Sequence, residues 1–246
     1  MSYFDIAELR PEKVQTIEVG YRTTIGEKLY VDGGYYFSVY RDFIGYNIGL
    51  DLLFLPGNEG FPNGVDVYRY AANSINEVQT QGASVGLNYY IDNQFMLSGN
   101  YSWNELVKTD EDDPIIPAFN TPKHKYNLGI TARDLKLKGK STWGFGVNYK
   151  WIQGFLFEGS PQFTGFVPTY DLLDAQVNFV VEPWNTTIKV GGSNLLQNIH
   201  IEAYGGPYVG RMLYGSLVYE FNHVKDRDER RRERKQQYAI SRVLSQ

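Results

Sequence analysis

The sequence predicts an all-β protein, an antiparallel transmembrane β-barrel, and three observations carry this prediction. Segments of about ten residues alternate between apolar and polar side chains, as half-exposed strands do. The breaks between these segments are alternately short and long. Tyrosine and phenylalanine are abundant, with 20 and 14 copies, and occur at segment ends. A soluble β-sandwich also alternates, but its strands usually have only about 5–6 residues, so the barrel is the favoured interpretation.

Nine alternating segments follow one another, each long enough to cross a membrane as a strand of roughly 9–11 residues. In one of them Trp143, Phe145, Val147, Tyr149 and Trp151 share a face, opposite glycine, asparagine and lysine residues. No run of about 18 apolar residues is present, so no transmembrane helix is predicted. The nine segments lie near 13–24, 28–44, 79–90, 95–107, 124–134, 142–154, 172–182, 186–195 and 211–221.

The connections predict which end of the barrel faces which side of the membrane. "TIGEK", "DNQ", "LKLKGKS" and "EPWN" are short turns, which outer-membrane barrels place in the periplasm. The long connections are rich in Gly, Pro, Asn and Asp and are predicted to be extracellular loops. Ligand contacts are expected from these loops, without individual residues assigned; they are 46–78, 108–123, 155–171 and 196–210.

The polar positions of the strands are predicted to face the water-filled interior of the barrel. Their expected role is to form the wall of this lumen. The candidates are Glu18, Arg22, Tyr36, Asn100, Asn104, Lys125, Asn127 and Asn148.

The strand count indicates that 1–221 is the C-terminal portion of a larger barrel. If "EPWN" is periplasmic, strands 211–221 and 13–24 both run inward, so the N-terminus lies outside the cell. Complete bacterial barrels have even strand numbers, and an unpaired edge in lipid is costly. The start, "MSYFDIAELRPEKV", lacks the features of a signal peptide, in agreement with a fragment.

The final segment, 222–246, is predicted to be a charged periplasmic tail, either helical or disordered. From residue 225 onward the chain carries eight Lys and Arg against four Asp and Glu, whereas the preceding part carries 16 against 24. An acidic body with a basic end does not suggest nucleic-acid binding.

Nothing in the sequence predicts an enzyme, a cofactor or a metal centre. There is no cysteine and no HExxH, GxSxG or phosphate-loop motif. The three histidines are His124, His200 and His223, and His124 is interpreted as the start of a strand rather than a metal ligand. "TDEDDP" (109–114) contains carboxylates that suit Ca²⁺, but a solvated loop tip is the favoured interpretation. Its residues Asp110, Asp112 and Asp113 are a hypothetical source of steering toward cationic ligands.

Six stretches, in order, resemble the C-terminal half of the β-barrel of TonB-dependent outer-membrane receptors, particularly those of Bacteroidetes-like bacteria. Pro-x-His-Lys-x-Asn at a strand start and Asn-Leu at a turn (Asn194, Leu195) are two of the shared features. The resemblance spans roughly 9–221. The six stretches are "LRPEKVQTIEVGYR", "LYVDGGYYFSVYRDFI", "TQGASVGLNYYIDNQFMLSGNYSW", "NTPKHKYNLGI", "VGGSNLLQN" and "GGPYVGRMLYGSLVYEF".

The resemblance implies about nine strands of a barrel with about 22 in the Gram-negative outer membrane. It implies uptake of a scarce nutrient such as a siderophore, cobalamin or a glycan. The implied partners are membrane lipid, a missing N-terminal barrel and plug, the inner-membrane TonB complex acting through that plug, and the barrel assembly machinery. It further implies that Leu217, Tyr219 and Phe221 form the terminal assembly signal. A passive porin-like or structural barrel and a soluble β-sandwich binding module are the alternatives.

Overall fold

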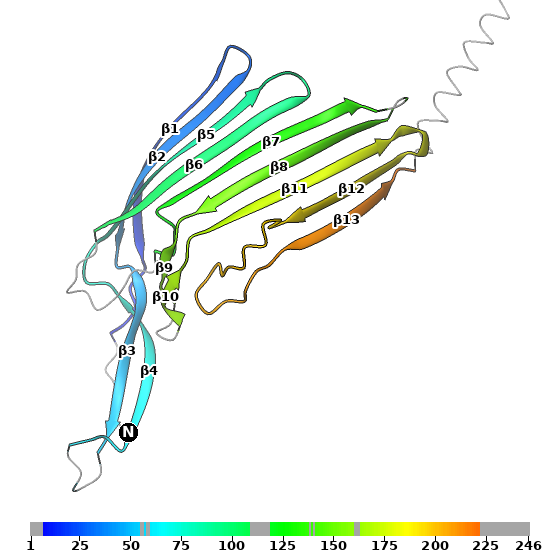
Figure 1. Cartoon of the computed structure of the whole chain (residues 1–246). Helices are drawn as coiled ribbons and strands as arrows, with labels where there is room; N and C mark the ends of the chain where they lie inside the picture. The colour runs from blue at the N-terminus through cyan, green and yellow to red at the C-terminus, as the bar shows by residue number, and fades with distance from the viewer. Residues whose placement is uncertain are drawn as a thin grey trace, which may run out of the picture.

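The computed structural model describes residues 7–54, 57, 60–108, 119–137, 139, 141–159 and 163–221. In this part of the chain the regular structure is mainly β-strand (Figure 1), and the short 3-10 helix η2 (Glu182–Trp184) lies between two of the strands. None of its helices has the length and apolar character needed to span a membrane. The predicted tail, 222–246, and Asp110, Asp112, Asp113 and His223 lie outside the described residues.

Nine strands form one antiparallel sheet, and they are the nine that the alternation predicts. Consecutive members of the sheet are hydrogen-bonded neighbours. Strands β1 and β13 occupy the two edges and have no further neighbour among the described residues. The strands, in sheet order, are β1 (Lys13–Ile25), β2 (Leu29–Arg41), β5 (Val78–Tyr90), β6 (Phe95–Lys108), β7 (His124–Lys136), β8 (Thr142–Ile152), β11 (Tyr170–Val181), β12 (Thr186–Ser193) and β13 (Met212–Tyr219).

The short turns meet at one end of the sheet and the long connections at the other (Figure 1). The turn between β1 and β2 places both Gly26 and Glu27 at positive φ, 57° and 61°. Helix η2 connects β11 to β12 and ends at Asn185, also at positive φ. Positive φ at turn residues lets the chain reverse within a few residues while the strands keep their twist.

Two of the predicted loops contain strands of their own. Strands β3 (Ile44–Leu53) and β4 (Gly64–Asn73) form a hairpin that begins two residues before the predicted loop 46–78 and projects from the long-connection end of the sheet (Figure 1). Strands β9 (Phe155–Phe157) and β10 (Gly165–Val167) pair within 155–171. The sequence-based prediction contains both segments only as connections. Strands β9 and β10 have three residues each, too few for a period-two pattern, whereas β3 has ten residues and alternates at Ile44, Tyr46 and Ile48, so its pattern was available in the sequence.

The sheet is a single layer with little buried interior. The main buried cluster consists of Val167, Tyr170 and Leu172, where β9, β10 and β11 meet. Edge strands β1 and β13 have no buried residue. A β-sandwich instead packs two sheets face to face around a core about 10 Å thick, so the soluble sandwich is set aside in favour of the open part of a barrel.

Candidate functional site

All eight residues predicted to face the lumen lie on one face of the sheet. Glu18 lies opposite Tyr36, and Gly82 connects Tyr36 to Asn104 in register. Side chains directly opposite each other in paired strands project from the same face. This polar face carries Glu18, Arg22, Tyr36, Asn100, Asn104, Lys125, Asn127 and Asn148.

Side chains on the polar face are tied to one another across the strands. Arg22 Nε donates to Asp32 Oδ2 at 2.7 Å. The hydroxyl of Tyr36 donates to Asn104 Oδ1 at 3.1 Å, across the intervening strand β5. These contacts fix the orientation of the polar side chains along the wall.

Gly82 makes the contact between Tyr36 and Asn104 possible. A Cβ at this position would clash with the ring of Tyr36 and lie 2.8 Å from the carbonyl oxygen of Trp103. The ring therefore lies over the bare backbone of β5, between β2 and β6. A tyrosine lying across a glycine on a neighbouring strand covers backbone that would otherwise be exposed.

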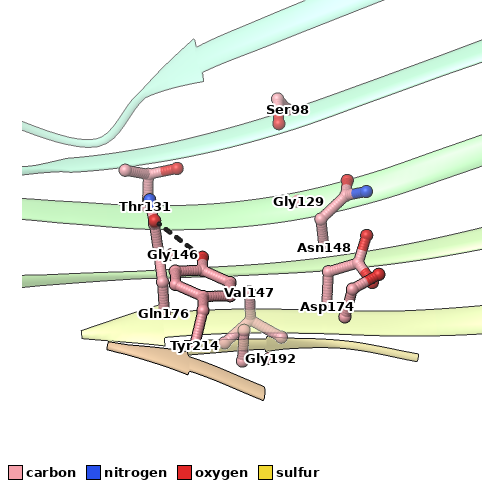
Figure 2. Close-up of a pocket in the computed structure, with 12 residues that line it drawn as sticks. Ser98, Gly129, Thr131, Gly146, Val147, Asn148, Asp174, Gln176, Gly192 and Tyr214 are labelled. Carbon is pink, nitrogen blue, oxygen red and sulfur yellow. Dashed lines mark hydrogen bonds between the residues drawn. The ribbon is translucent and has the colours of Figure 1, made fainter. Parts of the chain in front are cut away.

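A hollow of about 320 Å³ lies on the polar face across β6, β7, β8, β11, β12 and β13. Its polar side chains include Asn148, Asp174 and Gln176, and Tyr214 donates to Gln176 Oε1 at 3.3 Å (Figure 2). Gly129 and Gly146 have no side chains and so leave room on this face, where a Cβ would approach Ser98 and Gln176 respectively. Asp174 and Gln176 were not among the eight predicted residues, although the alternation in 173–181 puts both on the polar side.

A smaller hollow of about 170 Å³ adjoins the first and shares Ser98 and Asn148 with it. Asp32, Asn100 and Asn127 line it. Five of its lining residues are asparagine or aspartate, one on each of five neighbouring strands. The polar face thus offers hydrogen-bonding groups over much of its length.

The opposite face is apolar and exposed. Ile17 is 71 %, Leu128 57 % and Leu217 70 % exposed. In a soluble monomer, apolar patches of this extent are rare, whereas lipid-facing strands require them. We call this the apolar face; other exposed members include Val19, Tyr21, Val85, Leu87, Leu97, Tyr101, Val190 and Leu213.

Aromatic rings on the apolar face lie in two bands. Toward the short turns, Trp143 stacks on Phe179 at 6.5 Å between ring centroids. Toward the long connections, Tyr126 stacks on Trp151 at 5.4 Å. Residues 143 and 151 are eight positions apart on β8, which is roughly 27 Å along a strand and, at a tilt near 40°, a height of about 20 Å. This height is comparable with the apolar band of a membrane barrel, whose edges carry aromatic girdles.

His124 lies at the edge of the aromatic band nearer the long connections. Its ring stacks on Tyr101 at 6.0 Å, and its Nδ1 is 2.7 Å from the tyrosine hydroxyl. The described residues include no group of three or more His, Cys, Asp or Glu side chains that could hold a metal ion.

At the long-connection end, an asparagine pair fastens the segment after β12 to β11. The backbone N–H of Asn194 donates to Asp174 Oδ1 at 2.9 Å, and Asn194 Nδ2 donates to the carbonyl of Asn198 at 2.7 Å. Asn198 Nδ2 donates in turn to Asp171 Oδ1. Asn194 is 2 % exposed and at positive φ, which asparagine tolerates well. This network includes the Asn-Leu turn of the sequence and holds loop 196–210 against the sheet.

His200 joins the same network. Its Nδ1 is 2.9 Å from the carbonyl oxygen of Asn198, so this nitrogen carries the proton, and its ring stacks on Tyr170 at 4.2 Å. Loop 196–210 therefore starts from a fixed position at the long-connection end of the sheet.

Comparison with known families identifies this two-faced sheet. Residues 2–195 match the model of the TonB dependent receptor-like β-barrel. The chain belongs to the TonB-dependent receptor β-barrel family. The resemblance inferred from the sequence is therefore confirmed, and so is the fold class of an incomplete antiparallel barrel. The match is to a family of receptors and transporters rather than enzymes. No curated protein matches the chain.

Solved TonB-dependent receptors and transporters share the fold at low sequence identity. The copper transporter OprC is 16 % identical with a TM-score of 0.62, over 87 % of this chain and 33 % of OprC. The FrpB iron transporter from Neisseria meningitidis is 14 % identical with a TM-score of 0.61, over 88 % of this chain and 32 % of FrpB. The siderophore receptor PirA from Acinetobacter baumannii is 16 % identical with a TM-score of 0.60, over 87 % of this chain and 32 % of PirA. The chain therefore spans about a third of the length of these structures.

Proposed function

We propose that this chain is the C-terminal part of the barrel wall of a TonB-dependent transporter in the outer membrane of a Gram-negative bacterium. The observation that carries the proposal is the two-faced, single-layer sheet. Its apolar face suits lipid and its polar face suits a water-filled or plugged lumen. In this proposal the eight polar-face residues predicted from sequence line that lumen and contact the plug.

The sheet edges at β1 and β13, which are unpaired among the described residues, support closure of the barrel by a further segment that contains its own strands. Because the sheet has nine antiparallel strands, β1 and β13 run in the same direction. An antiparallel closure therefore requires strands of the opposite direction at both ends of the missing segment, and so an odd number of strands. A second copy of this chain would meet each edge in parallel, which breaks the all-antiparallel pattern of outer-membrane barrels. The fitting partner is an N-terminal barrel part that also carries the plug.

The proposed activity is uptake of a scarce nutrient of the siderophore, cobalamin or glycan class. The four long connections would capture the ligand, and the inner-membrane TonB complex would drive its release through the plug. Hairpin β3–β4 extends the first of these connections beyond the sheet (Figure 1). The structural neighbours include a copper transporter, an iron transporter and a siderophore receptor, which supports a metal-linked nutrient as the first class to test.

A transport assay separates this proposal from a passive or structural barrel. The receptor that contains this chain is expressed in a Gram-negative host whose own receptors are deleted, with and without an intact TonB complex. Growth on iron–siderophore complexes, cobalamin or glycans as limiting nutrient should depend on both the receptor and TonB. Uptake that persists without TonB would instead identify a passive pore. Recovery of the receptor in a soluble fraction without detergent would contradict both barrel functions.

A further inference from the structure

A third hollow lies on the polar face at the long-connection end of β1, β2 and β5. It has a volume of about 430 Å³, within the range of small-ligand pockets. Its lining is mostly aromatic and aliphatic, with one carboxylate and the hydroxyl groups of two tyrosines and one threonine. The lining residues are Glu18, Tyr36, Tyr40, Phe43, Val78, Thr80, Leu106 and Phe119.

The walls of this hollow are held in place by contacts on the sheet. Tyr36 lies over Gly82 and is fixed by its hydrogen bond to Asn104. Tyr40 meets Phe43 edge to face at 6.2 Å between ring centroids. Val78 and Thr80 are 6 % and 5 % exposed, although the wall is a single layer of strands, so the surrounding side chains shield them. A rigid aromatic surface of this kind loses little conformational entropy on binding.

Glu18 supplies the charge of the hollow. It is exposed and faces the polar side opposite Tyr36. Among the described residues its carboxylate has no ion-pair partner, in contrast to Asp32 on the same face, which pairs with Arg22. None of the described residues that line the hollow is a lysine or an arginine. A carboxylate beside several aromatic rings attracts a cation both directly and through the ring faces.

We propose that this hollow is a binding site for an organic cation that carries a ring, such as an arylalkylammonium group. The proposal rests on the proposed function, because it names a class of ligand for the same barrel mouth. The ring packs against Tyr36, Tyr40 and Phe43, and the ammonium group lies beside Glu18. A neutral ligand with the same ring packs against the aromatic side chains but has no charge to pair with Glu18. The site therefore prefers the cationic ligand.

The test uses tyramine and tyrosol as probes, because they share a phenolic ring and an ethyl chain and differ in an ammonium or a hydroxyl group. Equilibrium binding of each is measured by ligand-observed NMR with the complete receptor in lipid nanodiscs. Tyramine should bind about tenfold more tightly than tyrosol, as expected for a cation beside aromatic rings and a carboxylate. Glu18→Gln should reduce this preference to about one, and Tyr40→Ala should weaken both probes.

Glu12→Gln is the matched control. It removes the same charge just before β1, from a residue that does not line the hollow. It should leave the tyramine preference intact. The proposal is overturned if tyramine and tyrosol bind equally, if neither binds because another segment of the receptor fills the hollow, or if Glu12→Gln acts like Glu18→Gln. TonB-dependent uptake is scored separately, so loss of transport and loss of probe selectivity are distinguishable.

Discussion

Replacing Ile130 with arginine tests the assignment of the apolar face to lipid. Ile130 lies on β7 opposite Val147 on β8. Val147 is four residues from both Trp143 and Trp151, and so halfway between the two aromatic bands. Four residues correspond to about 14 Å along a strand. A guanidinium at this position is too far from either band to reach water easily by extending its side chain.

The expected cost follows from this depth. Arginine on the lipid face costs about 2–4 kcal/mol at the bilayer midplane and about 0–1 kcal/mol near the interfaces. Thr131→Arg provides the matched control, because Thr131 is the next residue on the same strand, is exposed and lines the hollow of Figure 2 on the polar face. It should cost much less, since its charge meets a polar environment. Ile130→Ala gives the part of the cost that comes from lost side-chain packing.

The measurement is reversible unfolding in guanidinium chloride of the complete receptor in lipid vesicles. Each variant is compared with the wild type by its free energy of unfolding. Equal losses for Ile130→Arg and Thr131→Arg would refute the assignment of the two faces. A smaller loss for Ile130→Arg than for Thr131→Arg would reverse it.

Three further predictions concern the wall, a turn and the last strand. Gly82→Ala should cost about 1–3 kcal/mol by overpacking, measured by the same unfolding assay; Gly210→Ala, whose Cβ meets nothing within 4 Å, should be nearly neutral. Hydrogen bonds from two backbone amides lower the pKa of Asp92 in the β5–β6 turn. Its stabilisation is therefore present above the ordinary aspartate pKa and lost as pH falls through the lower folded value. Amide hydrogen exchange at this turn should speed up over that window, and an unchanged pH profile in Asp92→Ala would contradict the cause. Phe221→Ala should lower the yield of heat-modifiable, membrane-inserted receptor if Leu217, Tyr219 and Phe221 form the assembly signal; normal insertion would contradict that role.

Phe221 lies where the sequence predicts that the membrane-spanning region ends. It follows β13, is 84 % exposed, and contacts Tyr219 edge to face at 4.7 Å between ring centroids. Two exposed aromatic rings on the same face at the end of the last strand suit the membrane boundary, where aromatic side chains are enriched. The assembly role itself stays a prediction.

The sequence by itself determined the nine strands of the main sheet and their faces. Alternation with period two is a local property. Trp143, Phe145 and Val147 can therefore be assigned to one face of their strand before the neighbouring strands are known. Connection lengths likewise determined which strand ends meet, since a turn of a few residues joins only adjacent antiparallel strands.

The tertiary structure decided which distant residues meet. Tyr36 and Asn104 are 68 positions apart in sequence and come together only because β5 brings Gly82 between them. The aromatic hollow beside Glu18 and the Asn194 network depend in the same way on register between strands. A shift of one residue in that register would turn each of these side chains to the other face. Such contacts are set by the pairing of whole strands, which the local alternation of the sequence does not encode.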